Sequence, residues 1–180
     1  KFKNIKTINW IPDFQHIHLP QMFSKKEIEN RDKSFIQIIK ESDVVVLSSF
    51  DALKDLRKFS SEYQNKARVL QFVSQPNSRY FELNENDKNN VLKKYDIKDE
   101  FFYMPNQFWK HKNHMTVFTA INELKKDGIQ ICVVCTGHLA DYRNKTYIDE
   151  IKNFIKINNL EKNIKLLGLV EYEDVFALIK

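Results

Sequence analysis

The feature that most constrains the fold is a repeated alternation between short apolar runs and longer segments with helical periodicity. Two of the runs read DVVVLSS (43–49) and IQICVVCTG (129–137), and apolar residues at helical spacing follow each of them. Strands that are covered on both faces of a parallel sheet have this continuous apolar character. Strand–helix–strand order favours parallel sheets with right-handed crossovers. We therefore expect an α/β protein.

The remaining elements are expected from the same periodicities. Ser24 and Glu27 form a capping box, which predicts the start of a helix. Gly128 is placed to end a helix. The expected strands cover residues 7–11, 43–49, 67–73, 101–104, 129–137 and 163–170, and the expected helices cover 25–41, 50–60, 87–95, 115–127, 146–159 and 171–180.

A polar stretch divides the pattern into two blocks. The residues SQPNSRYFELNENDKNN hold a proline and five asparagines and show little periodicity. We expect residues 1–75 to be the C-terminal part of one Rossmann-like domain, 76–90 to be a linker, and 91–180 to be the first part of a second such domain. Each block is an incomplete parallel-sheet lobe, and the chain begins with KFKN. This predicts an internal piece of a longer protein, truncated at both ends.

Composition excludes several classes of function. The chain has 180 residues, a net charge of +5 and a pI near 9.0. This mild excess is not gathered in a basic tail, so nucleic-acid binding is not expected, whereas anionic ligands or an anionic membrane surface are favoured. Cys132 and Cys135 form a CVVC pair inside a strand pattern without a second such pair. A redox CxxC pair lies at a helix N-terminus, and a zinc site needs further ligands at suitable spacing. We therefore expect no redox site and no metal.

Three polar loops follow expected strands, where ligands bind in open α/β sheets. They read PDFQHIHLP, PNQFWKHKNH and TGHLADYRN. The second loop (105–114) opens a helix, whose N-terminal amides favour an anion, and Lys112 lies at that opening. A diphosphate would suit this turn. The alternative is that Lys110 and Lys112 are solvated charges and that His111 and His114 are ordinary surface residues.

The order of these segments resembles the group 1 (family 4) glycosyltransferases of the GT-B fold. In that family, a loop with an HD pair precedes a strand that ends in serine. Here the corresponding segments are IPDFQHIHLP and SDVVVLSSFDALKDL, which put Asp13 on the family's Asp and Ser49 on its Ser. Pro12 stands where the family has His, so His16 or His18 would take over its work beside the donor sugar. The resemblance thus implies Asp13, His16 and His18 as catalytic residues.

The resemblance continues in the second block. The family's turn has a glycine and an arginine ahead of a lysine. Lys112 occupies the lysine position, while Gln107 and Asn106 replace the arginine and glycine. Two residues at the end of the next strand would line the same crevice. The implied donor-phosphate residues are Asn106, Gln107, Lys112, Thr136 and Gly137.

One family motif is missing from the sequence. The family carries E-x7-E, in which one carboxylate faces the donor sugar and the other binds the ribose. No two glutamates here have that spacing. In the family this motif follows a segment that resembles LGLVEYEDVFALIK, so we expect it beyond Lys180. The chain by itself should then be inactive.

The implied parent is a hexosyltransferase-type enzyme. It would move a sugar from a nucleotide-sugar donor to a glycan or lipid-linked acceptor, with retention, without a metal and without a further cofactor. We expect the parent to be cytoplasmic, with peripheral association at the inner face of the membrane as an alternative. We expect the isolated chain to self-associate. Two alternatives stay open: another GT-B enzyme, such as a nucleotide-sugar epimerase, or a non-catalytic α/β binding or interaction module.

Overall fold

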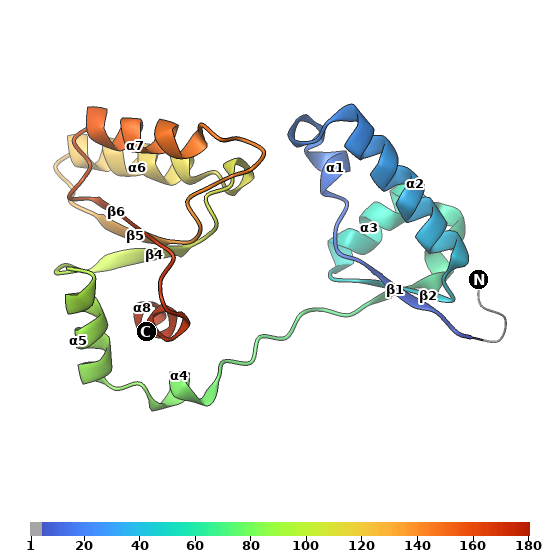
Figure 1. Ribbon diagram of the computed structural model, residues 1–180, viewed down its shortest axis with the longest axis horizontal. Helices are drawn as coiled ribbons and strands as arrows, with labels where there is room; N and C mark the ends of the chain where they lie inside the picture. Colours follow the sequence, from blue (N-terminus) through green and yellow to red (C-terminus); the bar gives the residue numbers. More distant parts are fainter. Residues whose placement is uncertain (1–4) are drawn as a thin grey trace. The chain divides into compact units, whose positions relative to one another are not determined.

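The computed structural model describes residues 5–180 and divides into two compact units, Lys1–Gln75 and Pro76–Lys180 (Figure 1). Within the described residues each unit has one three-stranded parallel sheet, with strand orders β1-β2-β3 and β4-β5-β6. The predicted fold class, α/β with two partial Rossmann-like lobes, is confirmed. Each unit is described below by itself.

The first unit follows the predicted β-α-β-α-β order, with short helical turns added. Its elements are β1 (Ile8–Ile11), α1 (Gln15–His18), η1 (Pro20–Met22), α2 (Lys25–Glu41), β2 (Val44–Leu47), α3 (Phe50–Phe59), η2 (Ser61–Lys66) and β3 (Ala67–Val69). The capping box is present at α2, because the Ser24 hydroxyl accepts from the Glu27 amide and the Glu27 carboxylate accepts from the Ser24 amide.

The second unit carries the remaining elements. They are α4 (Ser78–Glu82), α5 (Glu85–Lys94), β4 (Phe101–Pro105), η3 (Lys110–Lys112), α6 (His114–Lys126), β5 (Cys132–Thr136), α7 (Tyr147–Ile157), β6 (Ile164–Gly168) and α8 (Tyr172–Ile179). Gly128 follows the end of α6 with φ 81°, a backbone conformation that suits glycine.

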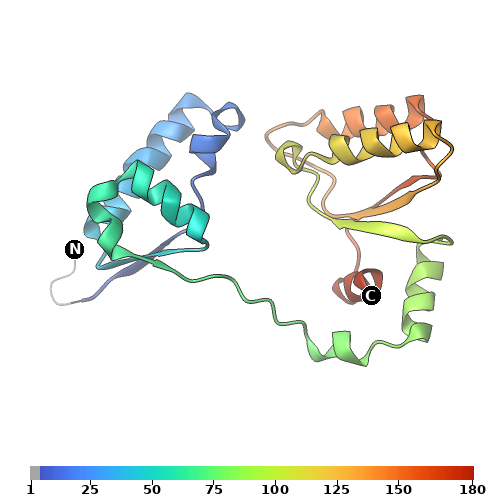
Figure 2. The same cartoon turned by 180° about the vertical axis from the view of Figure 1, so that it is seen from behind.

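The helices of the first unit cover one face of its sheet (Figures 1 and 2). Side chains alternate along a strand, so Val45 and Leu47 of β2 point to the same side and are fully buried against α2 and α3. Ile11 of β1 joins them. The core of this unit therefore lies between its sheet and a single layer of helices.

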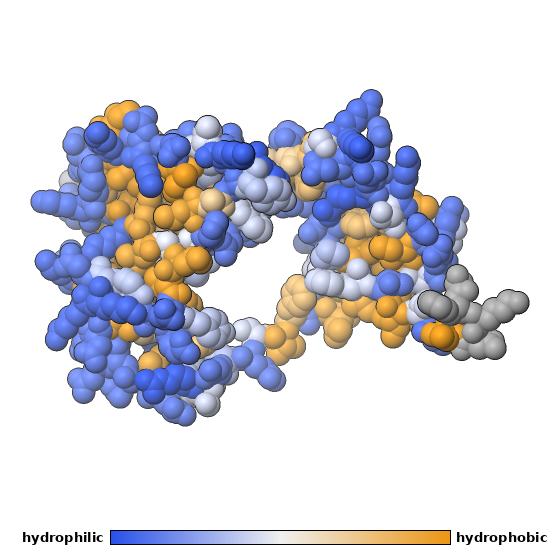
Figure 3. Space-filling model, in the orientation of Figure 1, coloured by the Kyte–Doolittle hydropathy of each residue, from blue (hydrophilic) through white to orange (hydrophobic). Residues whose placement is uncertain are grey.

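The opposite face of this sheet keeps apolar residues in solvent. Ile8 is 70% exposed and Trp10 is 52% exposed, whereas Ile11, the last residue of β1, is buried. Phe72 packs its ring edge-on to Trp10 at 5.9 Å between ring centroids. Figure 3 shows hydrophobic surface gathered over this lobe. We call the exposed apolar residues of this side of the sheet, together with those of the segment that follows β3, the bare face: Ile8, Trp10, Leu70, Phe72 and Val73.

Both faces of the sheet in the second unit are covered (Figure 1). On one side, α6 and α7 enclose a core around Phe118, Val133 and Ile151. On the other side, Leu178 of α8 and the residues beside α5 pack on Val134. Because β5 is central and covered twice, its valines are buried on either face.

Two segments differ from the expectation. The stretch 76–90, expected as a linker, holds α4 and the first six residues of α5, because Asn77 and Asn84 cap these helices with their side chains. The strand expected over 67–73 ends at Val69 in the structure. Beyond this point only the Leu70 amide still bonds to β2, at the Leu47 carbonyl, so residues 71–73 leave the sheet.

Candidate functional site

A pocket of about 500 Å³ lies at the carboxyl ends of β4, β5 and β6 in the second unit. This edge is where ligands bind in open parallel sheets. Of the residues that line it, Lys112 carries the only charge. The five residues that the sequence assigned to a phosphate site all line this pocket, and they are Asn106, Gln107, Lys112, Thr136 and Gly137. The other lining residues are Pro105, Trp109, Leu169, Val170, Tyr172 and Val175.

The turn that carries Lys112 is closed without glycine. Residues 110–112 form the short 3₁₀ helix η3, in which the Lys112 amide donates to the Trp109 carbonyl at 2.8 Å. Asn113 then adopts a left-handed conformation with φ 54°, and α6 begins at the next residue. Asparagine tolerates this backbone region better than most residues do. It supplies the conformation for which such turns commonly use glycine.

The loops after β4 and β5 are bonded to each other beside the pocket. The Gln107 side-chain oxygen accepts from the His138 amide at 2.8 Å, and the Phe108 amide donates to the His138 carbonyl at 3.1 Å. The oxygen of Gln107 is therefore used in joining the loops, while its amide nitrogen keeps its donor capacity. These two hydrogen bonds hold one wall of the pocket together.

Gly137 allows this close approach. A Cβ atom at this position would lie 2.3 Å from the Asn106 carbonyl oxygen, and its φ is +136°. Both facts exclude a larger residue without a shift of the backbone. Beside it, the Thr136 hydroxyl lies 2.7 Å from the Tyr103 hydroxyl, which fixes its side chain at the floor of the pocket.

His114 is a core residue, although the sequence left open a surface position for it. Its ring is fully buried and stacks on Phe108, with ring centroids 4.3 Å apart and planes 12° apart. Burial lowers the pKa of His114, and the Lys112 charge lowers it further, against an opposing effect of the Asn106 backbone. The imidazole is therefore neutral at pH 7. The positive charge at this turn comes from its lysines.

In the first unit, Asp13 and His18 have accessible side chains. Asp13 accepts from the Gln15 amide at 2.9 Å, and its Oδ1 is also 2.9 Å from an Arg31 guanidinium nitrogen. The His18 Nε2 lies 2.9 Å from a carboxylate oxygen of Asp55, and more than half of its side chain is exposed. Both residues follow β1 and can meet a ligand from solvent.

His16 has a different environment. Its ring is buried among Phe14, Phe35 and Phe59, and its Nε2 lies 3.0 Å from an Asp32 carboxylate oxygen. These contacts fasten α1 to α2. Because its ring is enclosed, His16 joins the segment after β1 to the core of the first unit.

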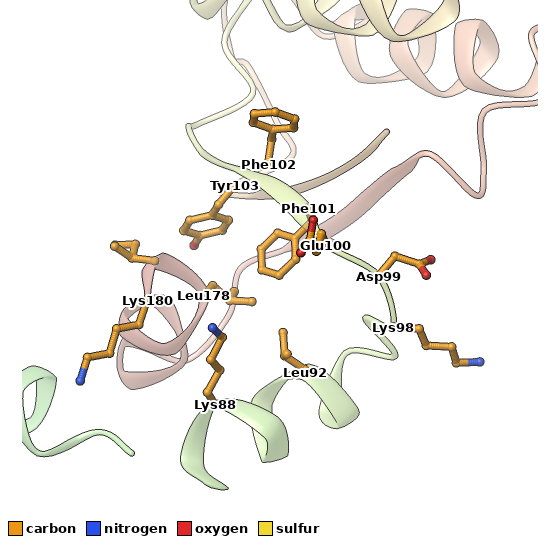
Figure 4. Close-up of a pocket in the computed structure, with 11 residues that line it drawn as sticks. Lys88, Leu92, Lys98, Asp99, Glu100, Phe101, Phe102, Tyr103, Leu178 and Lys180 are labelled. Carbon is orange, nitrogen blue, oxygen red and sulfur yellow. The ribbon is translucent and has the colours of Figure 1, made fainter. Parts of the chain in front are cut away.

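A larger pocket of the second unit lies away from this edge (Figure 4). It measures about 610 Å³ and is lined by residues of α5, the first half of β4 and the end of α8, with Leu92, Phe101 and Leu178 inside it. Lysines and carboxylates are mixed around it. Because it adjoins the amino-terminal half of β4, it lacks the placement at strand carboxyl ends that α/β ligand sites share.

Among residues 5–180, no group of three or more His, Cys, Asp and Glu side chains could hold a metal ion. No described helix is long and apolar enough to cross a membrane.

Several site residues were not foreseen. Leu169, Val170 and Tyr172 line the pocket because β6 ends beside β5, and the parallel topology alone could have placed their loop at this edge. Trp109 lies within the quoted turn but was not singled out. Asp141 accepts a hydrogen bond from the Lys110 amide, which is 31 positions away in the sequence. No local sequence pattern predicts such a contact.

The fold matches known structures, whereas no family model and no curated protein matches the sequence. A glycosyltransferase from Rickettsia africae is 20% identical, with a TM-score of 0.63 over 83% of this chain and 38% of that chain. HepE from Anabaena, in complex with UDP and glucose, is 14% identical, with a TM-score of 0.74 over 97% of this chain and 44% of that chain. Sucrose-phosphate synthase from Thermosynechococcus elongatus is 14% identical, with a TM-score of 0.68 over 97% of this chain and 42% of that chain.

The present chain spans less than half the length of each of these structures. The resemblance inferred from the sequence is confirmed at the level of the fold: the chain has the two Rossmann-like parallel-sheet lobes of GT-B glycosyltransferases.

Proposed function

We propose that the chain is part of a glycosyltransferase whose second unit binds the nucleoside diphosphate of a nucleotide-sugar donor. The observation that carries this proposal is the pocket at the carboxyl ends of β4–β6, where a lysine, two amides and a hydroxyl meet without a lining carboxylate. The structural likeness to HepE, which was solved with UDP and glucose, supports the same ligand class.

Lys112 is the proposed partner of the diphosphate. Its ammonium is a compact charge suited to phosphate oxygens. The N-terminus of α6, which begins two residues later, adds a favourable dipole. Gln107 and Asn106 would donate side-chain N–H groups to the same oxygens. Thr136 and Gly137 would line the crevice beneath.

Transfer would be retaining and independent of a metal. Breaking the bond between sugar and phosphate leaves negative charge on the departing diphosphate, and preorganised cationic and dipolar groups stabilise such charge. Lys112 and the α6 terminus would serve in this way. The acceptor would be a glycan or a lipid-linked glycan, and the transferred group a hexose.

The first unit is proposed to serve the acceptor and the reacting sugar. Asp13 and His18, with accessible side chains after β1, are the candidate groups. His16 belongs to the same proposal as a positioning residue: its buried ring would hold the loop that carries Asp13 and His18. The parent would work in the cytoplasm, at the inner face of the membrane where the acceptor is lipid-linked.

Titration of the 180-residue chain with UDP, GDP and ADP tests donor binding. If Lys112 meets the diphosphate, Lys112→Ala should weaken binding by about 1.5–3 kcal/mol, the size of a lost charge-assisted hydrogen bond. Lys110→Ala is the matched control, and we expect a much smaller effect. Equal losses would mean that only the general positive field matters. A non-catalytic interaction module should bind none of the three nucleotides.

A sugar-transfer assay tests whether this chain lacks catalytic groups that we expect elsewhere in the parent enzyme. Catalytic groups must be held within about 1 Å of their working positions, and misplacement can cost on the order of a hundredfold in rate. Without the E-x7-E carboxylates we expect no measurable release of nucleoside diphosphate from a panel of nucleotide-sugars. Turnover at an ordinary enzymatic rate would place the catalytic groups within these residues.

A further inference from the structure

Asp141 is a buried carboxylate that the proposed donor chemistry does not use. It lies in the loop between β5 and α7, and its side chain is 0% exposed. Its Oδ2 accepts from the Lys110 amide at 3.0 Å, and its Oδ1 accepts from the Arg143 amide at 3.0 Å. Buried carboxylates persist where hydrogen bonds and charges satisfy them.

The Lys110 amide is the first N–H of η3. The first amides of a helical turn have no partner within the turn, so an acceptor from elsewhere must satisfy them. Asp141 supplies this acceptor from 31 residues away. It thereby attaches the start of the three-residue turn that ends at Lys112 to the loop after β5.

The carboxylate is held in its charged form. Burial alone would raise the pKa of Asp141, but the amides of Lys110 and Arg143 and the Arg143 guanidinium together bring it below the usual value. The guanidinium lies against the rings of Trp109 and Tyr142, at 5.4 Å and 5.3 Å from their centroids. The anion and its cation are thus both fixed beneath the turn.

We propose that Asp141 is a positioning residue for the diphosphate site, acting through the Lys110 amide to hold Lys112 at the pocket. This inference rests on the proposed function, since it assumes that Lys112 meets a diphosphate. The hydrogen bonds between Gln107, Phe108 and His138 join the same two loops at a second point. The Asp141 bond controls the part of the turn that bears the lysine.

Inorganic pyrophosphate, titrated calorimetrically into the 180-residue chain, is the probe. Asp141→Asn keeps the side-chain volume and removes the charge, and we expect it to weaken binding about three- to tenfold. Lys110→Pro removes the N–H donor while leaving Asp141 in place, and proline is well tolerated at the first position of a helical turn. We expect a similar loss, whereas Lys110→Ala, which keeps the amide, should bind nearly as the wild type does.

A double-mutant cycle separates positioning from general stability. If Asp141 acts through Lys112, Asp141→Asn should cause no further loss of affinity in a Lys112→Ala background. Asn163→Ala is the matched control, because Asn163 is a buried side chain of the same unit that donates to the Ile131 carbonyl at 2.8 Å and does not line this pocket. It should lower thermal stability without changing the affinity for pyrophosphate.

The outcomes distinguish the two proposals. Wild-type affinity in Asp141→Asn and Lys110→Pro, while Lys112→Ala loses binding, overturns the positioning role alone. Full additivity of Asp141→Asn and Lys112→Ala also overturns it, since the two residues would then act separately. Absence of pyrophosphate and nucleoside diphosphate binding by the wild type overturns the proposed function, and the positioning role falls with it.

Discussion

The two units use the same strand order but cover their sheets differently. In the first unit, α2 and α3 enclose one face, and the other face leaves Ile8 and Trp10 in solvent. In the second unit, α6 and α7 lie on one face and α5 and α8 on the other. The same sheet topology therefore gives one core layer in the first case and two in the second.

The different covering of the two sheets shows what an apolar strand pattern indicates. DVVVLSS and IQICVVCTG both read as strands meant for burial on two faces. In the second unit Val133 and Val134 are both buried, whereas in the first unit Val45 is buried and its neighbours Val44 and Val46 are only partly so. The pattern indicates on how many of its faces a strand carries apolar side chains. It does not indicate whether helices of the described residues pack on each of those faces.

The largest effect should come from the doubly covered unit. Phe118→Ala empties a fully buried site between α6 and the sheet, and we expect a loss of about 3–5 kcal/mol in the free energy of unfolding. Each unit contains one tryptophan, Trp10 or Trp109. Urea unfolding followed in single-tryptophan variants should show the loss at Trp109 only, because we expect the units to fold separately.

Phe102→Ala is the control for this substitution. Phe102 is a phenylalanine of the same unit that is 67% exposed, so its removal should change stability by at most about 0.5 kcal/mol. If Phe118→Ala shifted both tryptophan transitions equally, the units would not be independent cores, and the comparison between them would fail.

The second effect concerns the extra helix layer of the second unit. Asp174 of α8 accepts from Lys94 Nζ and from the Tyr95 hydroxyl, each at 2.6 Å, which ties α8 to α5. Asp174→Asn should cost about 1.5–3 kcal/mol at pH 7, the range for hydrogen bonds to a charged group. Chemical denaturation of both proteins measures the difference.

The pH dependence of that difference is a sharper test. Burial alone would raise the pKa of Asp174, but the hydrogen bonds from Lys94 and Tyr95 lower it below its ordinary value of 3.8. A carboxyl whose folded pKa is lowered stabilises the fold above its unfolded pKa and loses this contribution as pH falls through the folded pKa. The stability gap between wild type and Asp174→Asn should therefore shrink below pH 3.8. A constant gap would mean that the charge is irrelevant.

A smaller effect is expected between pH 7 and pH 5, and again in the second unit. Burial lowers the pKa of His114 from its ordinary value of 6.5. The unfolded chain then binds a proton that the folded unit does not, so stability falls as pH drops below about 6.5. His114→Phe, which keeps a ring beside Phe108, should remove this loss. If the variant kept the same pH dependence, another group would be its source.

The smallest effect on stability should come from the bare face of the first unit. Trp10→Lys replaces a half-exposed ring that contacts the ring of Phe72, so the free energy of unfolding should change by about 1 kcal/mol or less. Exposed apolar surface and open strand edges favour association, however. Light scattering across concentration should show dimers or higher species for the wild type and fewer for Trp10→Lys. A monomeric wild type would contradict this interpretation of the bare face.

The sequence predicted the elements better than their limits. The alternation of strands and helices was correct because it depends on local periodicity. The segment 76–90 was misjudged because its asparagines were interpreted only as loop residues, although Asn84 and Asp87 form a capping box that was readable in advance. The end of β3 at Val69 depends on where its pairing with β2 stops, and this pairing is a tertiary contact that local sequence does not predict.

The placement of the candidate site's residues was predictable where topology decides and hidden where packing decides. Lys112 and Gly137 could be expected at one edge of the sheet because both follow strands that end there, and both line the pocket at that edge. The burial of His114 and of His16 could not, since it depends on phenylalanines from several elements. Asp141 was hidden for the same reason, because its partner amide lies 31 positions away in the sequence.

We propose that the second unit by itself carries a nucleoside diphosphate site at the carboxyl ends of its strands. Amide NMR spectra of the 180-residue chain during titration with UDP, GDP and ADP test it most directly. At least one nucleotide should shift the resonances of Asn106, Lys112 and Gly137, leave those of the bare face unchanged, and lose its effect in Lys112→Ala. Shifts confined to the residues around Leu92 and Leu178, or no shifts with any nucleotide, would contradict a diphosphate site at this edge of the sheet.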